Sequence, residues 1–370
     1  MGGCVLSTTV AKFAIEKVQY LDKNGKPLTK NLPEFAKDKD LLREMYRNMV
    51  RLRAFDAKAY ALQRTGNMGT YPASLGQEAI GIGYGMAMTK EDVLAPYYRS
   101  TGGLLMHGVT MLEIFLYWGG DERGSNFSVA KEDFPIAVPI ATQCLHATGI
   151  ATAIKYRKQQ RAVVTEIGEG GTSEGDFYEA INVAGIWNLG VVFFVNNNQW
   201  AISVPSAIQT NCETYAQKGI AAGIESVQVD GNDIIAVHEV SRRAMEKARA
   251  GKGATLIEAV SYRLCDHTTA DDASRYRSKE ELEKGWDAEP VMRLRKYLES
   301  IKAWTEKEEK ALQEEVAAEI ETAVQAYKNY PAPKPEDMFD TLYAELPKHI
   351  LKQREQAIAR GAKHASHHAH

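Results

Sequence analysis

The sequence predicts an α/β fold: a doubly wound parallel sheet flanked by helices, with an arm at each end of the chain. Two observations support this fold class. Residues 190–195 (GVVFFV) form a continuous apolar run, which is typical of a strand that is buried on both faces. Such runs alternate along the chain with segments of helical periodicity, and this alternation indicates strand–helix–strand units.

The first part of the chain predicts an arm followed by a long helix. Residues 1–40 are polar and contain a turn at residues 22–25, so we expect them to form an N-terminal arm. A helix is expected from Asp38 onward, because apolar side chains recur there at helical spacing with charges between them. These apolar residues are Leu41, Leu42, Met45, Met49 and Leu52.

The remaining chain predicts the sheet and a C-terminal boundary. The expected elements are a strand over 162–167, a helix over 176–188, strands over 190–195 and 226–229, a helix over 233–250, a strand over 254–260 and a charged helix over 305–327. Pro331 and Pro333 cannot continue that last helix. We therefore expect one α/β domain over residues 41–330 and a C-terminal arm and tail over residues 331–370.

The composition argues against several classes of protein. The 45 basic and 48 acidic residues give a formal net charge of -3, which disfavours a nucleic-acid-binding protein. No apolar run reaches the roughly 18 residues that a membrane helix needs, and no basic stretch precedes an apolar one as in a secretory leader. The cysteines form no CxxC pair, so we expect a reducing, cytoplasmic environment. They are Cys4, Cys144, Cys212 and Cys265.

Both ends of the chain carry weak signals. Residues 1–6 (MGGCVL) place Leu6 where a myristoylation signal requires Ser or Thr, so we expect no lipid there. The histidine-rich residues 363–370 are typical of a solvated terminus rather than of a built metal site.

Residues 168–203 carry the functional argument. Glu169 follows the strand expected over 162–167, and the asparagine run 196–198 follows the next strand along the chain. Ligands of open parallel sheets bind in the crevice outside the carboxyl ends of the strands. Glu169 and Asn198 can therefore face one ligand.

The residue types in this stretch indicate a metal-bound diphosphate. Gly168, Gly170 and Gly171 let the backbone approach a ligand closely, and exposed amides there favour an anion. Glu169 and Asn198 supply hard oxygen ligands, which suit magnesium or calcium. Magnesium usually takes one or two protein carboxylates and completes its shell with water and phosphates.

Other phosphate motifs do not match. No GxxxxGK[ST] P-loop is present, and Ser173 stands where the last glycine of GxGxxG would be, which disfavours a nicotinamide-binding site. A glycine-rich turn that binds no ligand is the remaining alternative.

The sequence resembles a known family at this point. GEG at residues 168–170 is separated by 26 residues from Asn197 and Asn198, and this arrangement resembles the thiamine diphosphate motif that is normally written GDG…NN. The segments GGTSEGDFYEAIN and NNxWAIS are similar to the alpha subunit of the decarboxylating component of 2-oxo acid dehydrogenase complexes. The same holds for GNMGTYPASLGQEA, DDASRYRSKEELEKGW and EDMFDTLYAELP, which most resemble the bacterial pyruvate-specific members. The resemblance covers nearly the whole chain and implies the thiamine diphosphate-binding fold.

Roles for individual residues follow from the resemblance. It implies that the Glu169 and Asn198 side chains and the backbone carbonyl of Trp200 bind magnesium, and that His267 is catalytic and assists acyl transfer. Residues implied to bind thiamine diphosphate are Tyr98, Arg99, Val138, Ile140, Gly168, Glu169, Gly170, Gly171, Asn198, Trp200, Arg263 and His267. Tyr98 and Arg99 would hold the diphosphate, because an arginine fork suits phosphate oxygens.

Further details of the site also follow from the resemblance. Ile140 would lie beneath the cofactor and hold it bent, and a histidine with a near-neutral pKa would suit proton transfer at position 267. Thr142 and Gln143 match positions that hold potassium in some relatives. The loop that carries His267 and Arg263 would become ordered around the cofactor through Asp271, Asp272, Tyr276 and Arg277.

The sequence departs from the family pattern at three positions. Glu169 replaces the common Asp, as in relatives that act on branched-chain 2-oxo acids. Asn196 stands where some relatives have a charged or longer residue, which weakens the case for a diphosphate contact there. Thr268 replaces the Ser that is phosphorylated in some relatives. His107 and His146 match no family role and are expected to be core or surface residues.

The expected function is that of a pyruvate dehydrogenase (acetyl-transferring) alpha subunit. It would use thiamine diphosphate and magnesium for the oxidative decarboxylation of pyruvate, on the route from glycolysis to acetyl-CoA, and pass the acyl group to a lipoyl-bearing acyltransferase. The resemblance implies a separate beta subunit and an α₂β₂ heterotetramer. A 2-oxoisovalerate (branched-chain) alpha subunit is the alternative within the class. A nucleotide-dependent oxidoreductase and a non-catalytic scaffold are the alternatives outside it.

Overall fold

A computed structural model describes residues 7–340 and 342–367 of the chain, with side chains up to Gly361. The lipidation signal and Cys4 lie outside the described residues, as do the side chains of the histidine-rich tail. The chain divides into two compact units, Met1–Ala323 and Val324–His370. The boundary predicted near Pro331 stays a prediction. Among the described helices, none combines the length and the apolar character that crossing a membrane requires.

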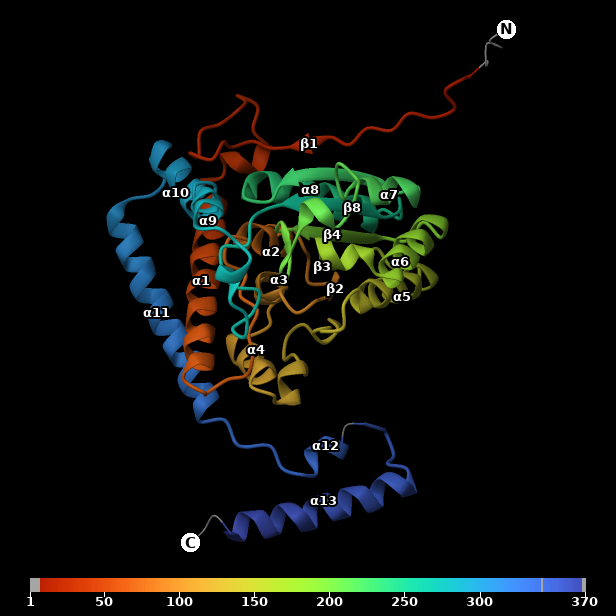
Figure 1. Cartoon of the computed structure of the whole chain (residues 1–370), viewed down its shortest axis with the longest axis vertical. Coiled ribbons are helices and arrows are strands. Elements are labelled where there is room, and N and C mark those ends of the chain that lie inside the picture. Colours follow the sequence, from red (N-terminus) through yellow and green to blue (C-terminus); the bar gives the residue numbers. More distant parts are fainter. Residues whose placement is uncertain (1–6, 341, 368–370) are drawn as a thin grey trace. The chain divides into compact units, whose positions relative to one another are not determined.

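A six-stranded parallel sheet forms the centre of the first unit (Figure 1). Its strand order is β1-β7-β8-β4-β3-β2, and all five pairs of neighbours are parallel. The strands are β1 (Lys17–Val18), β2 (Val93–Ala95), β3 (Val163–Gly168), β4 (Val191–Asn197), β7 (Glu225–Asp230) and β8 (Thr255–Val260). The predicted parallel α/β architecture is confirmed, and the four strands that the sequence predicted lie within two residues of their expected bounds.

Helices cover both faces of the sheet. Val163 and Ile167 of β3 share a core with Cys144 of α5 and Phe177 of α6, whereas Phe194 of β4 packs its ring against Tyr84 of α2 on the opposite face. The helices of this unit are α1 (Lys39–Arg64), α2 (Glu78–Gly85), α3 (Thr101–Met106), α4 (Met111–Trp118), α5 (Thr142–Tyr156), α6 (Gly175–Ile186), α7 (Gln217–Ala221), α8 (Ile234–Arg249), α9 (Lys279–Trp286) and α10 (Pro290–Ser300). Helix α11 (Glu306–Lys328) runs from the first unit into the second.

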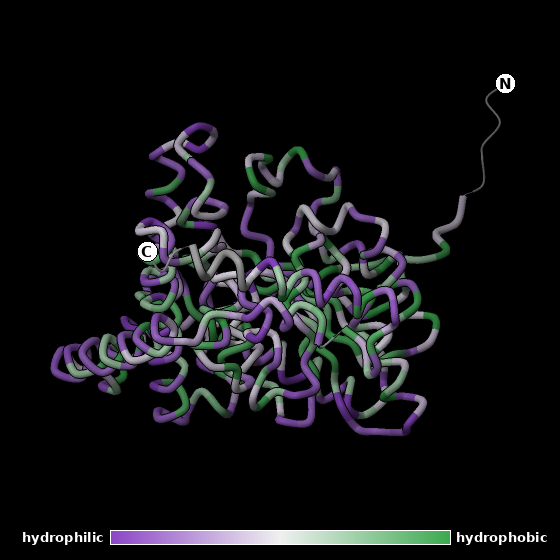
Figure 2. Tube along the Cα trace, turned by 90° about the horizontal axis from the view of Figure 1, so that it is seen from below, coloured by the Kyte–Doolittle hydropathy of each residue, from purple (hydrophilic) through white to green (hydrophobic). Residues whose placement is uncertain are grey.

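The start of the long helix follows from its sequence. Asp38 is the N-cap of α1, because its side chain accepts hydrogen bonds from the backbone N–H groups of Asp40 and Leu41. Before this helix, β1 adds a short edge strand to β7, so part of the predicted arm joins the sheet. Residues 7–14 are exposed, and both views show them leading away from the sheet (Figures 1 and 2).

Elements between residues 65 and 161 were missed by the sequence analysis. Helix α2 (EAIGIGYG) is buried at every position, so it has no polar face and no helical stripe. Strand β2 has only three residues, which is too short for a pattern of alternation. Outside this region, the antiparallel pair β5 (Trp200–Ala201) and β6 (Val204–Pro205) was also missed, because each strand has only two residues.

The second unit contains two helices after the end of α11. They are α12 (Asp337–Asp340) and α13 (Lys348–His367). An ion pair of 2.6 Å between Arg354 Nε and Asp340 Oδ1 joins them.

Candidate active site

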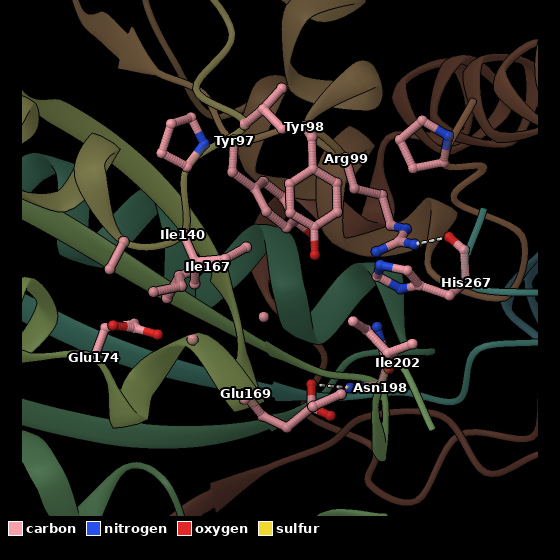
Figure 3. A pocket seen from close by; sticks show the side chains of 18 of the residues that line it. Tyr97, Tyr98, Arg99, Ile140, Ile167, Glu169, Glu174, Asn198, Ile202 and His267 are labelled. Carbon is pink, nitrogen blue, oxygen red and sulfur yellow. Dashed lines mark hydrogen bonds between the residues drawn. The ribbon is translucent and has the colours of Figure 1, made fainter. Parts of the chain in front are cut away.

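A cavity of about 470 Å³ opens at the carboxyl ends of β3 and β4 (Figure 3). In the register of these strands, Gly168 pairs with Asn196, so the turns that follow both strands start side by side. The predicted site residues that line this cavity are Tyr98, Arg99, Val138, Ile140, Gly168, Glu169, Gly170, Gly171, Asn198, Trp200 and His267. Arg263 is the one predicted residue outside the lining, and it lies behind the wall.

Glu169 forms the floor of the cavity together with Asn198. It is the first residue of a 3₁₀ turn, Glu169–Ser173, and is only 1% exposed. Its Oε2 accepts a hydrogen bond from the backbone N–H of Asn198 at 3.3 Å, and its Oε1 accepts one from Gln209 Nε2 at 3.5 Å. Burial raises the pKa of the Glu169 carboxyl, because it disfavours the charged form, and the hydrogen bonds and the positive charge of Arg263 offset this only in part. A bound metal ion would stabilise the charged form of such a buried carboxylate.

The Asn198 side chain is held with its oxygen free for a cation. Its Nδ2 donates to Gln77 Oε1 at 2.9 Å, so the amide nitrogen is already occupied. Its Oδ1 accepts only a long hydrogen bond from the Trp200 N–H, at 3.2 Å. The Trp200 carbonyl, the third predicted metal ligand, accepts from Arg263 Nη1 at 3.1 Å and keeps a second lone pair.

The glycine turn is shaped by close packing. A Cβ on Gly170 would lie 2.3 Å from the Cβ of Ala201, and a Cβ on Gly171 would lie 2.8 Å from Ile167. No larger residue fits at either position without moving the neighbouring chain. The turn therefore brings its backbone amides close to the cavity, which favours an anion.

Two buried guanidinium groups lie in and behind the wall of the cavity. Arg99 is 4% exposed and donates to two backbone carbonyls, from Nε to Ala73 O at 2.9 Å and from Nη2 to His267 O at 2.6 Å. Arg263 is fully buried, and its Nε has no hydrogen-bond partner. Burial and the neighbouring Arg99 lower the pKa of Arg263.

Neither arginine has an acidic partner. Within residues 7–340 and 342–361, no carboxylate lies within ion-pair distance of Arg99 or Arg263. Buried charges are normally paired, so these two guanidinium groups favour an anionic ligand. The Cζ atom of Arg99 lies 5.3 Å from the centre of the Tyr98 ring, and the Tyr98 side chain points into the cavity (Figure 3).

His267 differs from the expectation of a near-neutral histidine. Burial and the positive charges of Arg99 and Arg263 lower its pKa to about 3, so the ring is neutral at pH 7. Its Nδ1 lies 3.4 Å from Arg263 Nη1, which makes this nitrogen an acceptor.

The loop around His267 is held by residues that the sequence predicted to order it. Asp271 accepts from the His267 N–H at 2.8 Å and from the Tyr276 hydroxyl. Arg277 donates to the carbonyl of Arg263. Asp272 contributes less, because its side chain caps only the short turn at residues 273–275.

The rim of the cavity is apolar and exposed. Val138, Ile140 and Ile202 are 49%, 46% and 55% exposed. Ala141 and Ile202 also have positive φ angles, of 68° and 56°, which L-residues rarely adopt. Such strain persists where the surrounding structure fixes it, often at binding sites.

Two predicted positions and several missed residues complete the site. Gln143 donates to the carbonyl of Glu166 at 2.8 Å while its Oε1 is buried without a partner, and the potassium site at Thr142 and Gln143 stays a prediction. The sequence analysis did not identify Gln77 and Gln209, which hydrogen-bond to the side chains of Asn198 and Glu169. Gln77 stands in the family-like segment GNMGTYPASLGQEA, which could have drawn attention to it.

Comparisons with known proteins bear on nearly the whole chain. A sequence model of the family described as "Dehydrogenase E1 component" matches residues 46–336. The chain is 41% identical over 337 residues to "Pyruvate dehydrogenase E1 component subunit alpha" of Acholeplasma laidlawii, which covers 90% of this chain and 97% of that protein. It is 36% identical over 352 residues to the protein of the same name from Staphylococcus aureus (strain Mu50), and the match covers 95% of this chain and 94% of that protein.

A relative named for a different substrate is about equally similar. The chain is 38% identical over 348 residues to "3-methyl-2-oxobutanoate dehydrogenase subunit alpha" of Mycobacterium tuberculosis (strain CDC 1551 / Oshkosh), covering 93% of this chain and 94% of the relative.

Proposed function

The chain belongs to the dehydrogenase E1 component family as an alpha subunit, and from this premise we propose that it acts on pyruvate with an acetyl group passed to a lipoyl-bearing acyltransferase. The family makes it a thiamine diphosphate-dependent oxidoreductase of a 2-oxo acid dehydrogenase. This membership decides against the nucleotide-dependent oxidoreductase and the non-catalytic scaffold.

Magnesium is proposed as the metal that joins the diphosphate to the floor of the cavity. Its protein ligands would be the carboxylate of Glu169, Asn198 Oδ1 and the carbonyl of Trp200. Among the described residues, no group of three His, Cys, Asp or Glu side chains could hold a metal alone. Magnesium does not need such a group, because phosphate oxygens and water complete its shell.

The unpaired arginines are the observation that carries the proposal. Arg99 and Arg263 are buried without carboxylate partners, and a doubly charged diphosphate would supply the missing negative charge. Tyr98 would add a hydrogen bond from its hydroxyl. When bound, thiamine diphosphate supplies the nucleophilic carbon and takes up the electrons released as carbon dioxide leaves.

His267 is proposed to move a proton during acyl transfer. Since Nδ1 accepts from Arg263, the neutral ring carries its proton on Nε2, from which it can donate to a reacting group, and Asp271 holds the backbone N–H of the same residue. The negative charge of a bound diphosphate would offset the two arginines and raise the pKa of His267 from its low value. The apolar rim would exclude water from the reacting atoms.

Binding of the cofactor tests this function. We expect the complex of this chain with its beta subunit to bind thiamine diphosphate in calorimetric titrations when magnesium is present, and to bind it far more weakly after chelation. Binding that is independent of a divalent metal would contradict the magnesium site. No binding under either condition would contradict the function itself.

A branched-chain 2-oxo acid is the second candidate substrate. Glu169 and the near-equal similarity to the 3-methyl-2-oxobutanoate relative favour it. A pocket difference of one methylene changes binding by only roughly 1–3 kcal/mol, so both acids can be turned over. We expect a larger kcat/KM with pyruvate than with 2-oxoisovalerate, and the reverse order would overturn the assignment of substrate.

The chain is proposed to work as half of an active site in an α₂β₂ assembly. Its described part provides a diphosphate and metal end, and the exposed rim of Val138, Ile140 and Ile202 offers an apolar face to a second subunit. The beta subunit would then supply the groups that face the other end of the cofactor.

A further inference from the structure

A buried carboxylate lies behind the cavity and has no role in the proposals above. Glu166 lies in β3, three residues before Glu169, and is 1% exposed. Strand alternation places it on the α2 side of the sheet, opposite to the core that Val163 and Ile167 share with α5 and α6. Within the described residues, no cationic side chain lies within ion-pair distance of it. A buried charge of this kind must be stabilised by hydrogen bonds.

Four side chains donate hydrogen bonds to this carboxylate. Oε1 accepts from Asn196 Nδ2 at 2.8 Å and from the Tyr97 hydroxyl at 3.2 Å. Oε2 accepts from the Tyr84 hydroxyl at 2.9 Å and from the Ser100 hydroxyl at 3.1 Å. Burial raises the pKa of Glu166, and these four hydrogen bonds oppose that rise. A carboxylate accepts from all four partners at once, whereas a neutral amide of the same shape would require a hydroxyl partner to reverse its role from donor to acceptor.

These donors connect Glu166 to both halves of the proposed cofactor site. Tyr97 and Ser100 bracket Tyr98 and Arg99, which point into the cavity (Figure 3). The Ser100 hydroxyl also accepts from the Tyr97 N–H at 3.3 Å, which closes the segment on itself. Asn196, the third contact, lies on β4 two residues before the proposed metal ligand. Its side chain is thus occupied by Glu166 and does not reach the cavity.

We propose that Glu166 is a positioning residue that holds the diphosphate-binding segment and the end of β4 in a fixed relation to each other. It does not touch the cofactor and acts through Tyr97 and Ser100 on one side and Asn196 on the other. This inference rests on the proposed function, because its effect is read from thiamine diphosphate binding.

The test is the cofactor affinity of the assembled complex, measured by calorimetric titration with thiamine diphosphate at saturating magnesium. Glu166→Gln keeps the volume of the side chain but replaces one acceptor with an N–H₂ group, so the hydroxyls on that side must turn from donors into acceptors. We expect Kd to rise by about 10- to 100-fold, as for outer-sphere partners of metal ligands. The kcat at saturating cofactor should change little, because the reacting groups are untouched.

A pair of hydroxyl variants provides a matched control. Ser100→Ala and Tyr84→Phe each remove one hydroxyl donor from Glu166 Oε2, and both side chains are buried. Ser100 belongs to the diphosphate-binding segment and does not line the cavity, whereas Tyr84 lies on α2. We expect Ser100→Ala to weaken cofactor binding and Tyr84→Phe to leave Kd unchanged. This pair also decides the question if Glu166→Gln does not fold.

The outcomes separate the inference from the proposed function. An unchanged Kd in a folded Glu166→Gln variant, or equal losses in Ser100→Ala and Tyr84→Phe, would overturn the positioning role. If the unmodified complex binds no thiamine diphosphate, the proposed function fails and the role of Glu166 falls with it.

Discussion

The floor and the rim of the cavity differ in how far this chain completes them. On the floor, Glu169 and Asn198 are buried and held by Gln209 and Gln77, so their positions are set within the chain. On the rim, Val138, Ile140 and Ile202 are about half exposed. The floor thus has the properties of a preorganised binding site, whereas the rim has those of a surface that a partner covers. In the proposed α₂β₂ assembly, this difference would mark where one subunit ends its contribution and the next begins.

Removal of the floor carboxylate should have the largest effect. We expect Glu169→Ala to weaken magnesium-dependent binding of thiamine diphosphate by more than about 100-fold, which exceeds the usual loss from an outer-sphere change. The free energy of unfolding of the cofactor-free protein should not fall, because burial disfavours this charge in the folded state. Calorimetric titration and chemical denaturation would measure the two quantities.

Glu174→Ala is the matched control for that variant. Glu174 is an exposed carboxylate that lines the same cavity. We expect its removal to leave the affinity nearly unchanged. Equal losses from Glu169→Ala and Glu174→Ala would mean that only the net charge of the cavity matters.

Loss of His267 should have the next largest effect. We expect His267→Ala to slow acyl transfer to a lipoyl acceptor by about 100-fold or more, the range of a general acid or base, with a much smaller change in cofactor Kd. Single-turnover kinetics with pyruvate and a lipoyl domain would measure the transfer step. Thr268→Ala, at the next position along the cavity wall, is the control and should retain most of the rate.

A charge on the rim should weaken assembly with the beta subunit. Asp accepts a positive φ more readily than Ile does, so Ile202→Asp should leave the fold intact. Burying its charge at an interface should weaken association by about 30-fold, or about 2 kcal/mol, as measured by analytical ultracentrifugation. Met292→Asp places the same charge at an exposed apolar residue of α10. If both variants weaken assembly equally, the rim has no special part in the interface.

The smallest expected effect is a pH dependence of stability. The lowered pKa of His267 means that the unfolded chain binds a proton between pH 6.5 and about 3 that the folded chain does not. Stability from this group is therefore complete above pH 6.5 and is lost as the pH falls below it. Below pH 6.5, His267→Gln should reduce the slope of the free energy of unfolding against pH by at most about 1.4 kcal/mol per pH unit. Parallel slopes for the two proteins would contradict the shifted pKa.

The fold could be predicted where its elements are long and patterned. The apolar runs of β3 and β4 indicated their bounds within two residues, and the periodic stripe of α1 indicated where that helix starts. Helix α2 could not be found in this way, because it is buried all round and has no periodicity. Strands β1 and β2 are too short to show a pattern.

The candidate site was predictable in its first layer only. Motif spacing and resemblance pointed to Glu169, Asn198 and Arg99, all of which the structure brings to one cavity. The residues that orient them come from distant segments, as Gln77 does for Asn198, and nothing local in the sequence marks such a pair. Glu166 was passed over because it stands inside an apolar strand, where its four donors are visible only in the folded chain.

The most direct test is a crystal structure of the assembled subunits with thiamine diphosphate and Mn²⁺ in place of Mg²⁺. The account predicts one anomalous peak between the Glu169 carboxylate and Asn198 Oδ1, at about 2.1 Å from each, with the diphosphate reaching Arg99. A peak elsewhere, or a cofactor bound with Glu169 and Asn198 turned away from its metal, would contradict it.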